Sequence, residues 1–266
     1  MLNTIAMLVR ARKKGRYVPA FNIYNLETIQ AALESSCRAE SPVILAFGER
    51  YLSYASFEVI AQMAECLSRE HPYPVALHLD HCRSLENMYQ ALKAGFTSVM
   101  YDGSNLPFSE NIEQTVQARK IADSFGASLE GELGGMNDES GEGENGLFTE
   151  PMQAKKFVRE TQVDSLAVAV GNAHGLYREK PHIEFQRLKE IYELTHIPLV
   201  LHGSSGLSME TLNLAAQIAV AKINVNTEIA MAGAAALRQA LQKETKMENA
   251  LQWARESLVN VMMHFY

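Results

Sequence analysis

The sequence predicts an α/β fold, a (β/α)8 TIM barrel with additional C-terminal helices. Short apolar runs rich in β-branched or aromatic residues alternate with longer stretches whose apolar positions have helical spacing. Runs such as LAVAV and IPLVL are apolar almost throughout, which is typical of parallel strands covered on both faces. Eight such units fit the roughly 250 residues that this kind of barrel usually occupies.

The expected strands follow one another at similar intervals. In chain order they are Tyr17–Asn22, Pro42–Phe47, Val75–Asp80, Ser98–Asp102, Ser128–Leu133, Ser165–Val170, Pro198–His202 and Lys222–Thr227. Helices are expected between them at Leu26–Arg38, Phe57–Arg69, Leu85–Lys93, Ile112–Ser124, Met152–Thr161, Phe185–Thr195 and Met209–Ala219, and two more after the last strand. An open, doubly wound sheet is the alternative, but the first strand, VPAFNIYN, lacks a glycine-rich turn after it.

Composition indicates an ordinary globular protein and excludes several function classes. Of the 266 residues 47% are hydrophobic, and no linker divides them, so one domain is expected over residues 1–266. The net charge of -7 and a single short basic cluster, RARKKGR, argue against nucleic-acid binding and favour a solvated helix end. We expect no membrane span and no signal peptide, hence a cytoplasmic protein. The 3 cysteines are too scattered for a disulfide framework.

Polar residues gather at the expected carboxyl ends of the strands, which converge on one mouth of a barrel. His81, His174 and His202 each fall at such an end, and imidazoles that meet there would hold Zn²⁺ with an open fourth position. Any one of them alone would more often be a hydrogen-bonded structural residue. His78 lies deeper in its strand, so a structural or supporting role is expected for it.

Glycine and hydroxyl residues follow two of these histidines, at Gly175 and at Gly203-Ser204-Ser205-Gly206. A helix is also expected to begin near Thr227. Backbone N–H groups at such turns bind anions, and barrels commonly bind phosphate after strands seven and eight. The pattern therefore predicts a phosphate pocket next to a metal, with a simple turn as the alternative for HGSSG.

The segment Gly134–Glu150, GGMNDESGEGENGLFTE, is too glycine-rich and polar to form a core element. It is also long for a connection between a strand and a helix of a barrel. We expect a mobile loop that covers the site, and an inert surface excursion is the alternative.

Four segments in this order resemble the signature segments of the class II, zinc-dependent fructose-1,6-bisphosphate and tagatose-1,6-bisphosphate aldolases: LHLDHC, VGNAHGLY, LVLHGSSG and KINVNTE. The resemblance begins at VPAFNIYNLET and ends at Glu228. It implies an enzyme of carbohydrate metabolism, for example glycolysis, that reversibly cleaves a ketose phosphate to dihydroxyacetone phosphate and an aldehyde. It further implies one catalytic Zn²⁺ per chain, room for a monovalent cation near the phosphate, and a homodimer or homotetramer.

The resemblance also implies a role for each matched residue. His81, His174 and His202 would be the zinc ligands. Asp102 and Glu132 match carboxylates that take an alternative metal position in some members, or they support the ligands from the strand ends. The segments that bind dihydroxyacetone phosphate match Asn22, Gly175, Gly203, Ser204, Ser205, Asn224, Val225, Asn226 and Thr227.

Two acid/base groups follow from the same resemblance. With zinc polarising the ketone carbonyl, a base must remove the adjacent C–H proton. The family uses a glutamate of the mobile loop, for which Glu139 is the candidate and Asp138 and Glu142 are competitors. Asp80 would protonate the aldehyde oxygen during condensation. No Schiff-base lysine is needed, and Lys222 is expected to open its strand, away from the mouth.

Three departures from the family leave the substrate open. The loop lacks the usual Gly-Gly-x-Glu-Asp pattern, and Asn226 stands where the fructose branch has an acidic residue and the tagatose branch a small one. The tail lacks the Asp-Pro-Arg segment that binds a second phosphate, so Arg255 or Arg238 would substitute, or the aldehyde is non-standard or unphosphorylated. A non-catalytic aldolase-like subunit and another metal-dependent barrel enzyme, such as a hydrolase, are the remaining alternatives.

Overall fold

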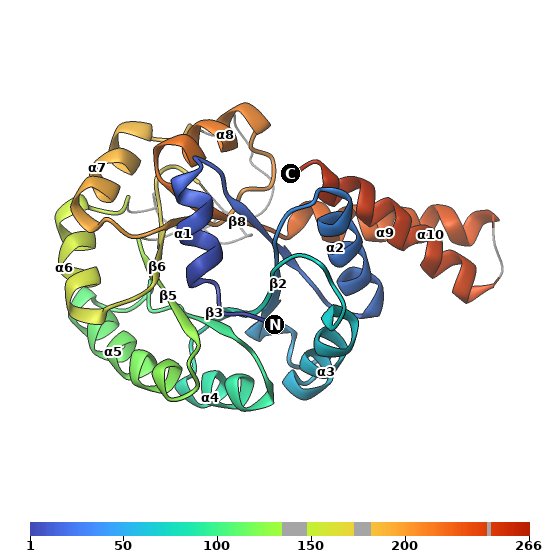
Figure 1. Cartoon of the computed structure of the whole chain (residues 1–266), viewed down its shortest axis with the longest axis horizontal. Coiled ribbons are helices and arrows are strands. Elements are labelled where there is room, and N and C mark those ends of the chain that lie inside the picture. Colours follow the sequence, from blue (N-terminus) through green and yellow to red (C-terminus); the bar gives the residue numbers. More distant parts are fainter. Residues whose placement is uncertain (135–147, 173–181, 244–245) are drawn as a thin grey trace.

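The computed structural model of the chain is a closed barrel of parallel strands in sequential order, in which β8 pairs with β1 (Figure 1). The structure describes residues 1–134, 148–172, 182–243 and 246–266. The strands are β1 (Val18–Asn22), β2 (Val43–Gly48), β3 (Val75–Cys82), β4 (Ser98–Tyr101), β5 (Ser128–Leu133), β6 (Ser165–Val168), β7 (Leu199–Leu201) and β8 (Val220–Val225). The predicted barrel is confirmed, and each strand end lies within about two residues of its expected position.

The helices are α1 (Ile5–Lys13), α2 (Leu26–Arg38), α3 (Phe57–Ser68), α4 (Leu85–Ala94), α5 (Phe108–Ser124), α6 (Pro151–Thr161), α7 (Phe185–Thr195), α8 (Met209–Ile218), α9 (Thr227–Lys243) and α10 (Met247–Met263), with a short 3-10 helix, η1 (Glu49–Tyr51), after β2. Helices α2 to α8 surround the barrel on its outside (Figure 1). Polar caps define where several of them begin. Asn25, Ser56, Ser84 and Ser208 each accept the backbone N–H of the residue three positions later.

Helix α1 closes one end of the barrel, and Figure 1 shows it lying across the strands. Its buried residues Met7 and Leu8 share one apolar cluster with strand residues such as Val18 and Ile44. The basic cluster lies at the end of this helix, where Arg12 donates to the carbonyl oxygen of Ile218, at the end of α8, over 2.6 Å. The basic cluster is therefore a helix end, as predicted. One of its residues, Arg12, also attaches this end to the barrel.

The two predicted C-terminal helices are present as α9 and α10, which project from the barrel beyond α2 in Figure 1. Helix α10 packs against α9 and α2, and the ring of Phe265 lies 6.2 Å from that of Phe21 in β1. Among the described residues, none of the helices combines the length and apolar character needed to cross a bilayer.

Candidate active site

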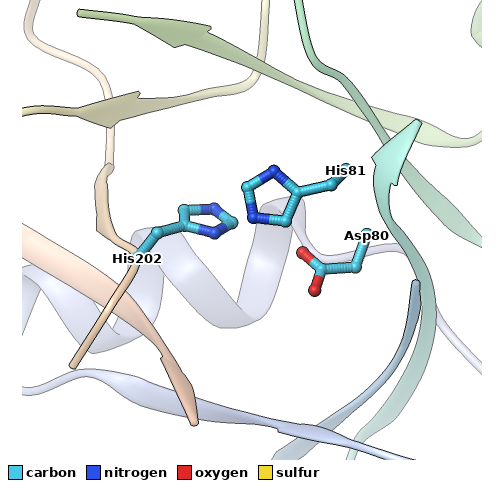
Figure 2. Close-up of side chains that lie close together, drawn as sticks. All are labelled: Asp80, His81 and His202. Atoms are coloured by element: carbon cyan, nitrogen blue, oxygen red, sulfur yellow. The ribbon is translucent and has the colours of Figure 1, made fainter. Parts of the chain in front are cut away.

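Asp80 and His81 lie side by side at the end of β3, yet both face the barrel mouth (Figure 2). Consecutive strand residues normally point to opposite faces of a sheet. Here the pairing of β3 with β4 shifts between Leu79 and Cys82, and His81 has a left-handed backbone with φ 48°. This bulge turns the His81 side chain toward the same space as Asp80.

His202 follows β7 and approaches from the facing side of the barrel (Figure 2). Its ring centroid lies 4.6 Å from that of His81. One potential ligand atom from each of Asp80, His81 and His202 lies within 4.8 Å of the others, and the same holds for the set His81, Asp102 and Glu132. The structure thus brings together two of the three predicted histidines and both predicted carboxylates. His174, Gly175, Glu139, Asp138 and Glu142 lie outside the described residues.

Two asparagines hold the Asp80 carboxylate. Nδ2 of Asn22 donates to Oδ2 over 3.2 Å, and Nδ2 of Asn224 donates to Oδ1 over 2.9 Å. Burial alone would raise the pKa of Asp80, but neighbouring positive charge, above all that of His81, outweighs it and brings the pKa down to about 2. Asp80 is consequently an oriented carboxylate that can accept a proton.

Two carboxylates lie close to Nδ1 of the His81 ring. Nδ1 of His81 lies 3.3 Å from Asp102 Oδ2 and 3.6 Å from Glu132 Oε2. Burial opposes protonation of His81, but Asp80, Asp102 and Glu132 raise its pKa to about 9. Burial, followed by the neighbouring Asp102, raises the pKa of Glu132 well above its usual value. Buried carboxylates packed this closely are stable only with a compensating cation or proton.

The donor set fits a divalent metal of the zinc type. Neutral imidazole nitrogens and carboxylate oxygens are both ordinary ligands of Zn²⁺. His81 and His202 offer the former, and Asp80, Asp102 and Glu132 offer the latter, all from strand ends that face the mouth. These residues could hold one such cation with a position left for a substrate oxygen.

Zinc affinity is expected to rise with pH. Because the pKa of His81 is raised to about 9, its ring is protonated at neutral pH, and a bound cation must displace that proton. Raising the pH toward about 9 should strengthen binding by up to about tenfold per pH unit, and acidification should weaken it by the same factor. Chelator-competition titrations at several pH values measure this slope. A pH-independent affinity across the neutral range would contradict it.

The predicted phosphate segments lie at adjacent strand ends. Gly203 and Gly206 have φ 61° and 86°, values that favour glycine. The buried Ser204 hydroxyl donates to the carbonyl of Leu201 over 2.9 Å, so a phosphate oxygen, which needs a donor, would have to meet the backbone N–H of this residue. The N–H of Gly206 donates to Glu228 Oε1 over 2.9 Å, which fixes this loop to the first turn of α9.

Sequence reasoning missed a rim of aromatic and basic side chains beside Asn226. The Asn226 Oδ1 accepts hydrogen bonds from the Tyr24 hydroxyl and, over 3.4 Å, from the Tyr51 hydroxyl. Arg50 donates to the Tyr51 hydroxyl over 2.8 Å and lies over its ring. These residues follow β1, β2 and β8, so their shared position at strand ends was the signal that could have found them.

The prediction that Lys222 opens its strand is wrong. Strand β8 begins at Val220, so Lys222 is an interior residue of it, and its buried side chain crosses the barrel to β5. There Nζ lies 2.7 Å from Glu130 Oε2, while Glu130 Oε1 lies 2.9 Å from His202 Nε2. A lysine within a fully buried strand signals such a partner, because charged groups are rarely buried unpaired.

The contacts of Arg255 and Arg238, the two arginines suggested for a second phosphate, do not place either of them beside Asp80. Arg255 of α10 donates to Gln30 of α2 over 3.4 Å. Arg238 is exposed on α9, about three turns beyond Thr227.

Comparisons with known proteins agree with this geometry. The family model for fructose-bisphosphate aldolase class-II matches residues 2–266. The YdjI aldolase from Escherichia coli K12 is 32% identical, with a TM-score of 0.90 over 99% of this chain and 95% of that one. A protein from Coccidioides immitis described as a candidate fructose-1,6-bisphosphate aldolase is 26% identical, with a TM-score of 0.89 over 99% and 96%. Fructose-bisphosphate aldolase from Campylobacter jejuni, at 22% identity and a TM-score of 0.82 over 97% and 91%, shares the fold.

Proposed function

Because the chain belongs to the class II fructose-bisphosphate aldolase family, a family of zinc-dependent lyases, we propose that it reversibly cleaves a ketose phosphate to dihydroxyacetone phosphate and an aldehyde. The observation that carries this proposal is the cluster of Asp80, His81 and His202, whose ligand atoms lie within 4.8 Å of one another. We take His174, on the segment after β6, as the third zinc ligand.

The residues around Asp80 suit proton exchange at the bond that breaks. Bound zinc would supply Lewis acidity at the ketone carbonyl. In cleavage, the Asp80 carboxylate accepts the proton of the substrate hydroxyl that becomes the aldehyde, and in condensation it returns that proton. Asn22 and Asn224 hold both carboxylate oxygens, so Asp80 meets the hydroxyl in a fixed orientation. Glu139 remains our candidate for the base that exchanges the C–H proton of the other half.

The phosphate of the dihydroxyacetone half would bind between the loop after β7 and the start of α9. The first N–H groups of a helix attract anions, and Thr227 is the first residue of α9. Gly203 and Ser205 would offer backbone N–H groups from the facing loop, which Glu228 ties to the same helix. Holding one end of the substrate in this way aligns the reacting carbons.

The aldehyde half would lie on the side of Tyr24, Tyr51, Asn226 and Arg50. Tyr24 lies two residues after Asn22, whose amide donates to the Asp80 carboxylate, so this rim adjoins the residue that handles the aldehyde oxygen. We propose that these four residues select the aldehyde. A cleavage and condensation screen with dihydroxyacetone phosphate against phosphorylated and unphosphorylated aldehydes tests the function and defines the substrate class. A wild-type protein that binds zinc but processes none of them would instead support the non-catalytic alternative.

Activity is expected to depend on metal and not on a lysine imine. Chelator should abolish cleavage and zinc should restore it, whereas borohydride added with dihydroxyacetone phosphate should leave the activity unchanged. The buried Lys222 is held by Glu130, so its amine is committed to an ion pair. Cleavage assays and the intact mass after borohydride treatment measure both effects. Cleavage by metal-free protein, or a stable adduct on Lys222, would overturn the proposal.

A further inference from the structure

Among the residues that the structure describes, one lysine is fully buried in the barrel interior. Lys222 of β8 has no solvent exposure, and neither does His78 of β3. Nζ of Lys222 lies 2.7 Å from Glu130 Oε2 and 3.0 Å from His78 Nε2. The other oxygen of Glu130, Oε1, lies 2.9 Å from Nε2 of His202. A continuous polar chain therefore links Lys222 to a predicted zinc ligand.

The proton positions along this chain follow from what each group can donate. A lysine ammonium only donates, so His78 Nε2 must be an acceptor, and the His78 proton lies on Nδ1, which is 2.7 Å from Ser98 Oγ. A carboxylate paired with an ammonium only accepts, so Glu130 Oε1 must receive the Nε2–H of His202. A neutral His202 with its proton on Nε2 has its lone pair on Nδ1.

The two oxygens of Glu130 have different partners, because Lys222 occupies one of them. Oε2 is held by Lys222 and, more weakly, by Ser165 Oγ at 3.4 Å. This leaves Oε1 for His202. Glu130 is only 2% exposed, and a buried carboxylate without its cation would lose both its compensation and its fixed orientation. The ion pair with Lys222 thus keeps Glu130 ionised and keeps its Oε1 directed at Nε2 of His202.

We propose that Lys222 is a positioning residue for the metal site, which acts through Glu130 to hold the His202 proton on Nε2 and so present Nδ1 to the cation. The inference rests on the proposed function only in taking His202 as a zinc ligand. Partners of this kind orient metal-bound histidines in other proteins, and their loss commonly weakens metal binding about 10–100-fold.

The direct test is the tautomer of His202 in metal-free protein. Long-range ¹H–¹⁵N spectra of the chain with ¹⁵N-labelled histidine distinguish a proton on Nε2 from one on Nδ1, and His202→Asn identifies the signal. We expect the Nε2–H form in the wild type and a mixture of tautomers in Lys222→Met. A wild-type His202 with its proton on Nδ1 would overturn the proposal, even if the methionine variant failed to fold.

Zinc affinity provides the second measurement. Lys222→Met and Glu130→Gln should each weaken zinc binding about 10–100-fold in chelator competition. Combining them should cause little further loss, because both act on the same contact with His202. Ser165→Ala, a buried change at the same carboxylate oxygen, is the matched control and should keep wild-type affinity. Additive losses, or wild-type affinity in Lys222→Met, would show that Lys222 does not act through Glu130.

These outcomes separate this inference from the proposed function. A wild type with the expected tautomer and zinc affinity but no aldol cleavage would contradict the function alone. A wild type that cleaves its substrate while Lys222→Met keeps the His202 tautomer would contradict the positioning role alone. Thermal unfolding of each metal-free variant shows whether a loss of zinc affinity follows from a loss of the fold.

Discussion

Replacing Asp80 with asparagine is expected to lower kcat for cleavage by about 10²–10⁴-fold while zinc stays bound. An amide has nearly the shape of the carboxylate but cannot take the proton of the substrate hydroxyl. It also places a donor against the amide groups of Asn22 and Asn224, which now donate to Asp80. Steady-state rates with the best substrate from the aldehyde screen, together with zinc content, measure the effect.

A surface aspartate provides the control for this substitution. Asp123 lies on α5 with a side chain that is 65% exposed and paired with Arg119, so Asp123→Asn makes the same chemical change far from the mouth. It should leave kcat at the wild-type value. If Asp80→Asn also kept the wild-type kcat with zinc bound, another group would have to exchange the proton.

Replacing His81 with asparagine is expected to abolish both zinc binding and cleavage. The loss of affinity should exceed the roughly 100-fold that removal of an outer partner causes, because a ligand itself is lost. Asparagine tolerates the left-handed backbone that His81 adopts, so the bulge in β3 should persist. Zinc content after dialysis and cleavage rate are the measurements.

The chain contains a matched control for that change. His196 also has a left-handed backbone, with φ 55°, but it is exposed at the end of α7. His196→Asn repeats the substitution in the same backbone conformation and should retain zinc and activity. Equal losses in the two variants would mean that the effect is not specific to the imidazole of His81.

Much of the fold could be predicted because its strands are short, apolar and regularly separated by helical patterns. The boundary between α8 and β8 could not be predicted in this way. The run from Ala215 to Ala221 is apolar except for Gln217 and has no glycine or proline to separate the end of α8 from the beginning of β8. The change occurs at the single residue Ala219, so the predicted strand began two residues late and Lys222 was placed at its end.

The strand ends also predicted much of the candidate site. Asp80, His81, His202, Asp102 and Glu132 meet there because parallel strands of a barrel all end at one mouth. The partners of these residues could not be predicted in the same way. Whether Glu130 meets Lys222 depends on which residues face each other across the barrel interior, and no local pattern encodes that pairing.

The left-handed backbone of His81 also restricts how this site can evolve. Asparagine, aspartate and histidine adopt this conformation more readily than other residues with a side chain, whereas cysteine gains no such tolerance. A single substitution to aspartate would supply a hard oxygen ligand without rebuilding β3. A soft thiolate at the same position would have to bear the backbone strain as well. Selection for a different metal at this position would therefore reach oxygen-preferring cations more readily than thiolate-preferring ones.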